Sequence, residues 1–160
     1  MTATAHVEVD ETYVGGKDRS MGRPTEDSGS KKTAVFGMVE RGGEIITRVV
    51  PNAKGELLPL ITGHVIPGTV ISSDQFKVYK NLRKLGYKHA AVNHFREWVR
   101  GDVHTNTLEG FWSQFKNSIR GTHKSISRKH MQKYLREFEF HFNFRRDSSS
   151  AMFDRLIQAF

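Results

Sequence analysis

The chain contains no cysteine, and no stretch of it approaches the ~20 apolar residues that a membrane-spanning helix needs. The absence of cysteine excludes a disulfide framework, a thiolate nucleophile and any zinc site with Cys ligands, so His, Asp and Glu remain as metal ligands. The first residues, MTATAHVEVD, have neither a basic n-region nor an apolar h-region. We therefore expect a soluble, unsecreted protein that works in the cytoplasm.

Positive charge is abundant and unevenly distributed. The 160 residues carry a formal net charge of +8, and residues 77 to 146 hold 16 Lys or Arg against five Asp or Glu. Aromatic residues are interleaved with these cations, a pattern that fits a surface for nucleic acid, although most of the aromatics fit a hydrophobic core equally well. The chain is long enough for one domain, residues 1 to 160, and the charge predicts an anionic partner.

β-Branched and apolar runs predict a sheet with helices. Residues 6–14 read as a strand, and the polar, Gly- and Ser-rich residues 17–32 as a mobile loop. Residues 33–41 and 44–51 form a predicted hairpin around Gly42 and Gly43. The remaining expected elements are a helix over 52–63, a strand over 69–73, a helix over 76–85, a strand over 88–93, a helix from 105 and a second long helix from near 127.

The segment EFEFHFNFR at residues 137–145 alternates at period two, as a strand does. Upstream residues from Met131 continue a helical apolar stripe through it, so we predict a helix there. Three antiparallel strands, a crossover helix, two more strands and then helices are the element order of a ribonuclease H-like α/β fold. In that order the first strand is central.

Three acids stand on three different predicted elements. Asp10 lies in the first strand, Asp74 directly follows the strand 69–73, and Glu109 lies in the helix from 105. If the three elements bring these acids to one site, the site suggests metal-dependent phosphoryl transfer, because Mg²⁺ prefers oxygen ligands. Simpler roles stay open: a surface strand residue for Asp10, a helix cap for Asp74, and for Glu109 a capping box with Asn106.

Glu8 shares a face with Asp10 at spacing two, which allows it to support the site, but we expect it to face solvent. On the helix from 105, the polar residues Glu109, Ser113, Lys116 and Arg120 share one side beside an apolar stripe. The stripe consists of Leu108, Phe111, Trp112, Phe115 and Ile119.

The segments VEVDETYVGGK (7–17), ISSDQFKVY (71–79), VNHF (92–95) and above all VHTNTLEGFWSQFKNSIRG (103–121) resemble the insertion-sequence transposases of the ISXO-like group. The resemblance spans nearly the whole chain. It implies a ribonuclease H-like catalytic domain whose DDE triad is Asp10, Asp74 and Glu109, with 34 residues between the second and third acids.

The resemblance also implies the reaction and its partners. Such an enzyme uses two Mg²⁺ ions, for which Mn²⁺ can substitute, to cleave DNA strands at the ends of a bacterial mobile element and to transfer them to target DNA. DNA is the expected partner, and synapsis of two ends implies a homodimer or higher oligomer. A DNA-binding remnant without activity and a metal-dependent nuclease of the same fold are the alternatives.

Several further residues match family positions or extend the basic surface. Lys116 matches the basic residue that accompanies the third acid, and Asn106 is an alternative third ligand. Relatives usually carry an N-terminal DNA-recognition region, and because none precedes Met1 we expect this chain to be the catalytic part or a truncated remnant. The expected DNA-binding residues are Lys116, Arg120, Lys124, Arg128 and Lys129, and the expected accessory residues are Asn106, His94 and His104. The two histidines could orient a phosphate or a water molecule, and a purely structural role fits them equally well.

Overall fold

The computed structural model describes residues 6–15, 32–51, 53–74, 77–91, 104–123 and 126–158. The predicted mobile loop lies outside these residues except for Lys32. So do Lys124 and His94, two of the expected site residues.

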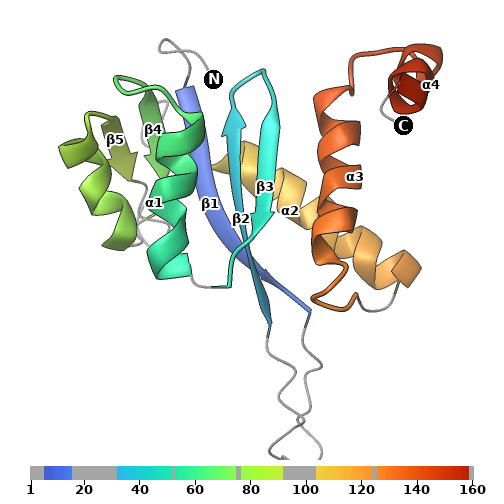
Figure 1. Cartoon of the computed structure of the whole chain (residues 1–160), viewed down its shortest axis with the longest axis horizontal. Coiled ribbons are helices and arrows are strands. Elements are labelled where there is room, and N and C mark those ends of the chain that lie inside the picture. Colours follow the sequence, from blue (N-terminus) through green and yellow to red (C-terminus); the bar gives the residue numbers. More distant parts are fainter. Residues whose placement is uncertain are drawn as a thin grey trace, which may run out of the picture.

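Five strands form one mixed sheet in the order β3-β2-β1-β4-β5 (Figure 1). β1 is antiparallel to β2 and parallel to β4, so the prediction of a central first strand is confirmed. β2 and β3 form the predicted antiparallel hairpin, and β5 pairs in parallel with β4. The strands are β1 (His6–Val14), β2 (Thr33–Glu40), β3 (Ile45–Val49), β4 (Val70–Ser73) and β5 (Lys88–Ala91).

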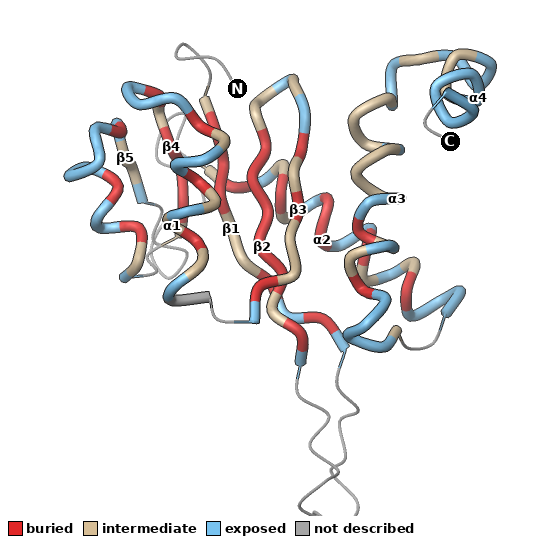
Figure 2. Tube along the Cα trace, viewed as in Figure 1, coloured by how far each residue is buried: buried red, intermediate tan, exposed pale blue. Residues whose placement is uncertain are grey.

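Helices cover both faces of the sheet, and each face has its own hydrophobic core. On one side Val7 and Val9 of β1 pack in a cluster with Leu57 and Ile61 of α1 (Ala53–His64). The opposite cluster joins strand residues such as Val35 to helices α2 (Asn106–Ser118) and α3 (Met131–Asn143). Figure 2 shows the resulting line of buried residues along the central strands. This layered mixed sheet is a ribonuclease H-like α/β architecture, as predicted.

The helical part agrees with the sequence prediction in type and differs in detail. The apolar stripe of α2 is buried, and the alternating segment 137–145 is helical through Asn143. α3 begins at Met131, four residues later than predicted, because residues 128–130 form a turn. A further helix, α4 (Ser149–Gln158), was not predicted. No helix among the described residues is long and apolar enough to cross a membrane.

β3 lies at the edge of the sheet, and side chains of α3 bind its outward backbone groups. Asn143 accepts a hydrogen bond from Ile45 N (2.7 Å) and donates one to Ile45 O (3.0 Å). Thr47 N donates to Glu139, and Gln132 Nε2 donates to Thr47 O (3.1 Å). An open edge strand can pair with another chain, so these α3 side chains protect β3 in place of a sixth strand.

Candidate active site

Helix α2 lies along a row of three β1 side chains, Glu8, Asp10 and Thr12. Residues at spacing two share one face of a strand, and four residues of strand span ~13 Å. Glu8 binds Thr107 and Thr12 binds Lys116, nine helical residues apart. Nine residues of α-helix also span ~13.5 Å. α2 therefore follows the row with Asp10 between its two points of attachment.

Glu8 is fully buried, so the expectation that it faces solvent is wrong. Its Oε2 accepts hydrogen bonds from the backbone amides of Thr107 (3.0 Å) and Leu108 (3.4 Å), which belong to the first turn of α2. Its Oε1 lies 2.9 Å from Arg41 Nε and 3.2 Å from His104 Nδ1. The first amides of a helix have no partner within the helix. Glu8 therefore caps α2, although it lies almost one hundred positions before that helix in the chain.

Capping from Glu8 changes the interpretation of Glu109. The N-cap of α2 is Thr105 rather than Asn106, and its hydroxyl donates to Glu109 Oε1 at 2.9 Å. Asn106 is instead the first residue of the helix and is exposed. The N-cap side chain makes no capping hydrogen bond to the backbone, so the capping box that we considered for Asn106 and Glu109 does not form. Glu109 is half-buried, and its charge acts on Asp10 of β1.

Asp10 has a strongly perturbed carboxyl group. Burial, which is the largest cause, and then the charges of Glu11, Asp74 and Glu109 together raise its pKa from 3.8 to about 7. The β1–β4 register pairs Glu8 with Ser72, so extending it by two residues sets Asp10 level with Asp74, which directly follows β4. The charges of the other two acids that the sequence singled out therefore act on the carboxyl group of Asp10.

The three acids are near enough for charges to act on Asp10, but they do not form a ready metal site. Within the described residues, no three His, Asp or Glu side chains come close enough together to hold one ion. Like charges in a partly buried place repel, which adds to the effect of burial on the raised pKa of Asp10.

Lys116 lies between the acids and a group of cations. Its Nζ donates to Thr12 Oγ1 at 2.5 Å. Burial lowers the pKa of Lys116, the charge of Asp10 opposes this effect, and the charges of Arg120 and Lys32 lower the pKa further. Lys116 is thus close to Asp10 on one side and to exposed cations on the other, a suitable position for a phosphate contact.

Close packing of α2 against the sheet depends on Gly37, which the sequence did not reveal as important. Gly37 of β2 is the register partner of Asp10. A Cβ atom at Gly37 would lie 2.6 Å from Trp112 Cζ2 and 3.0 Å from Leu108 Cδ2. Real Cβ atoms do not approach other atoms so closely, so glycine is what allows α2 to lie over Asp10. A single glycine inside a strand is the signal for such a close approach.

Glu11 is a second acid beside Asp10 that we did not predict. It points to the opposite face of β1, where it accepts a hydrogen bond from Tyr79 Oη at 2.5 Å. Burial raises the pKa of Glu11, its bond to Tyr79 lowers it, and the charge of Asp74 raises it. Asp74 therefore acts on carboxyl groups on both faces of β1.

The remaining expected residues are more dispersed. His104 lies against Glu8, which favours the structural role that we weighed for it. Arg120 is exposed on η2 (Ile119–His123), a π-helical continuation of α2, and Arg128 and Lys129 are exposed in the turn before α3. All three cations can reach a large anion in solution.

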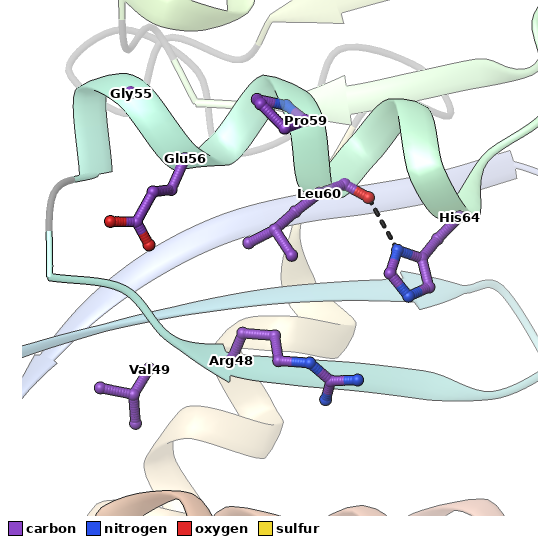
Figure 3. Close-up of a pocket in the computed structure, with 7 residues that line it drawn as sticks. All are labelled: Arg48, Val49, Gly55, Glu56, Pro59, Leu60 and His64. Carbon is purple, nitrogen blue, oxygen red and sulfur yellow. Dashed lines mark hydrogen bonds between the residues drawn. The ribbon is translucent and has the colours of Figure 1, made fainter.

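A cavity of about 360 Å³ lies elsewhere, between β3 and α1. Figure 3 shows its lining, in which His64 Nδ1 is hydrogen-bonded to Leu60 O at 2.8 Å. None of the three acids belongs to the lining. The carboxyl groups on β1, β4 and α2 are therefore the better candidate for the functional site.

A mixed five-stranded sheet with this strand order and with acids at β1, the end of β4 and α2 defines a ribonuclease H-like α/β protein. Comparison with known families is more specific: residues 2–143 match the ISXO2-like transposase domain. This chain belongs to that transposase family, as its motifs had indicated.

A curated protein of Haemophilus influenzae (strain ATCC 51907 / DSM 11121 / KW20 / Rd), described as an uncharacterized transposase-like protein, is 30% identical over 101 residues. The match covers 62% of this chain and 81% of the relative. No solved structure matches the chain.

Proposed function

We propose that this transposase domain cleaves DNA strands at the ends of an insertion sequence and joins them to target DNA, using two Mg²⁺ ions held by Asp10, Asp74 and Glu109. The supporting observation is the pKa of Asp10, which burial and the neighbouring charges, including those of Asp74 and Glu109, raise to about 7. Three carboxyl groups concentrate negative charge where the mixed sheet and α2 meet.

The donor set suits Mg²⁺, with Mn²⁺ as a substitute, because carboxylate oxygens are hard ligands. The three carboxylates would have to move closer together than they are in the structure, and the charge of a cation would supply the attraction. When bound, the pair of ions stabilises the attacking and leaving oxygens of an in-line phosphoryl displacement.

The chain's own residues would hold and orient the substrate. Lys116, fixed between Thr12 and the exposed Arg120, would bind a phosphate of the DNA backbone beside the acids. In the first reaction water attacks the phosphodiester, and the bond to a 3′-hydroxyl breaks. In the second reaction that hydroxyl attacks a phosphodiester of the target DNA, the P–O3′ bond of the target strand breaks, and a target 3′-hydroxyl leaves. Both nucleophiles come from water or DNA, so no covalent bond to the protein forms.

The proposal extends to the assembly and the place of action. Joining two element ends requires that both be held together, so we expect a homodimer or higher oligomer on DNA. With DNA as its substrate, we expect the protein to act in the cytoplasm, with the nucleoid. Glu109 is favoured over Asn106 as the third ligand because its charge acts on Asp10.

One observation favours a different function. No three described side chains come together as a ready-made metal site, which is what a remnant that binds DNA without cutting it would show. That protein would keep the fold and the cations and would gain nothing from the acids.

An assay with DNA carrying the element's terminal repeats, in Mg²⁺ or Mn²⁺, separates these functions. We expect nicking and strand joining by the wild type, and loss of both in Asp10→Asn, Asp74→Asn and Glu109→Gln. Asp154→Asn, which removes an exposed acid from α4, is the matched control and retains activity. Equal behaviour of all five proteins refutes the catalytic proposal, and nicking without joining identifies a nuclease.

A further inference from the structure

Element η1 (Lys77–Leu85), just after β4, has a three-residue repeat in its sequence, KVYKNLRKL. It is a 3₁₀-helix rather than the α-helix that the usual spacing suggests. A 3₁₀-helix has three residues per turn, so the side chains at i and i+3 lie directly above one another. A sequence period of three therefore places each kind of side chain in a straight row, with neighbours in the row about 6 Å apart. Cations take the first position of each triplet and apolar residues the third: Lys77, Lys80 and Arg83 against Tyr79, Leu82 and Leu85.

The first two residues of the apolar row fix the helix to the protein, and Leu85 at its end is exposed. Tyr79 and Leu82 are completely buried in the core that contains α1. The guanidinium group of Arg83 donates two hydrogen bonds to His89 O, at 3.0 and 3.2 Å, and Gly86, with a φ of 87°, turns the chain toward β5. The cationic row of Lys77, Lys80 and Arg83 (the η1 row) is therefore held in place on the outside.

The η1 row dominates the charge of its surroundings. Residues 77–91 contain five Lys or Arg and no Asp or Glu, so this short stretch accounts for five of the eight net positive charges of the chain. All five side chains are exposed, and in the part of the chain that the structure describes none of them forms an ion pair with an acid. Such a row without counter-charges repels itself and gains most from a polyanion.

The row follows the second of the three acids directly in the chain, since it begins three residues after Asp74. Tyr79 on its buried side bonds to Glu11, so η1 packs on the face of β1 opposite to the Asp10 side chain. The cations near Lys116, in contrast, lie beside α2.

We propose that the η1 row is a second DNA-binding surface, which contacts successive phosphates of duplex DNA next to the acids. The proposal rests on DNA being the substrate, as in the proposed function, and adds a surface that the motifs did not indicate. The regular spacing of the cations along a rigid helix suits contact with the phosphates of DNA. Such contacts do not distinguish one base sequence from another.

The test compares two double variants that each remove two charges. Lys77→Gln with Lys80→Gln changes the η1 row and spares Arg83, which binds His89 O. Arg136→Gln with Arg146→Gln changes two exposed cations at α3 and after it. Binding of a fluorescently labelled duplex DNA is measured by anisotropy over a salt series in EDTA, so that no cleavage occurs. Circular dichroism melts verify folding, and Lys77→Arg with Lys80→Arg restores the charge.

We expect the η1 variant to bind DNA about tenfold or more weakly near 0.1 M salt, with a salt slope less steep by about 2, since each duplex phosphate contact contributes roughly 0.9. The Arg136 and Arg146 control should change the slope by less than half as much, and the arginine variant should bind like the wild type. Equal losses in the two double variants would overturn the proposal.

The outcome is independent of catalysis. If the wild type nicks DNA and the η1 variant keeps the wild-type slope, this surface is refuted while the proposed function stands. If the slope changes but no protein nicks DNA, the surface stands and the catalytic proposal falls. Binding of the wild type to vesicles of anionic lipid, with unchanged DNA affinity in the η1 variant, would also overturn the proposal.

Discussion

The ionised carboxylate of Asp10 destabilises the folded protein, because its pKa is higher in the fold than in the unfolded chain. Replacing Asp10 by an uncharged residue should therefore stabilise the protein. In the unfolded chain an aspartate has a pKa near 3.8, whereas burial and neighbouring charges raise that of Asp10 to about 7 in the fold. Between these two values the folded protein keeps a proton that the unfolded chain has lost. The stability of the wild type must then fall as the pH rises from about 4 to about 7.

The size of the effect follows from the shift. One pKa unit corresponds to about 1.4 kcal/mol, so the shift of Asp10 sets an upper limit of about 4 kcal/mol at a pH well above 7. Asp10 is half-buried, and water screens part of the repulsion. We expect Asp10→Asn to raise the free energy of unfolding by about 2 kcal/mol at pH ~8 in EDTA and to change it little at pH ~4.

Urea denaturation at both pH values measures this difference. Asp154→Asn serves as the control because its side chain is exposed on α4. Added Mn²⁺ should stabilise the wild type at pH ~8 and should not stabilise Asp10→Asn, because the ion needs the carboxylate. If Asp10→Asn is no more stable than the wild type at pH ~8, burial and the neighbouring charges do not destabilise the Asp10 carboxylate, and the reasoning about the site fails.

Three further predictions concern the framework around the site. Glu8→Ala should lower the free energy of unfolding by about 3 kcal/mol in urea denaturation, since it leaves Arg41 and two helix amides without their buried acceptor; no change would contradict the capping role. Gly37→Ala should cost about 1 to 3 kcal/mol and reduce DNA nicking by pushing Trp112 and α2 away from Asp10. Gly110→Ala on the same helix, where an added Cβ meets no atom within 4 Å, should not destabilise the protein, and equal effects of the two alanines would refute the close-packing argument. Asn143→Ala should expose the edge of β3, and light scattering on mild heating should detect faster self-association than in the wild type.

Local patterns in the sequence predicted most of the fold. Alternation and turn glycines placed the hairpin of β2 and β3, and the expected element order put β1 at the centre of the sheet. The helical stripe from Met131 correctly outweighed the alternating phenylalanines. These predictions succeeded because they depend on neighbours within a few residues.

Interactions between distant segments could not be read in the same way. Glu8 looked like a solvent-facing residue because nothing near it in the chain shows that Thr107 and Leu108 will need an acceptor. The helix expected over residues 76–85 is present as η1, but the sequence prediction did not specify that it is a 3₁₀-helix. Glu11 escaped notice because its partner, Tyr79, belongs to an element far along the sequence.

The central claim is that Asp10, Asp74 and Glu109 hold metal together, and anomalous diffraction from crystals soaked in Mn²⁺ tests it most directly. The account predicts anomalous density shared by the three carboxylates in the wild type, with the side chains drawn closer than in the present structure, and its loss in Asp10→Asn. Well-ordered carboxylates without such density, or with Mn²⁺ bound only elsewhere, would contradict it.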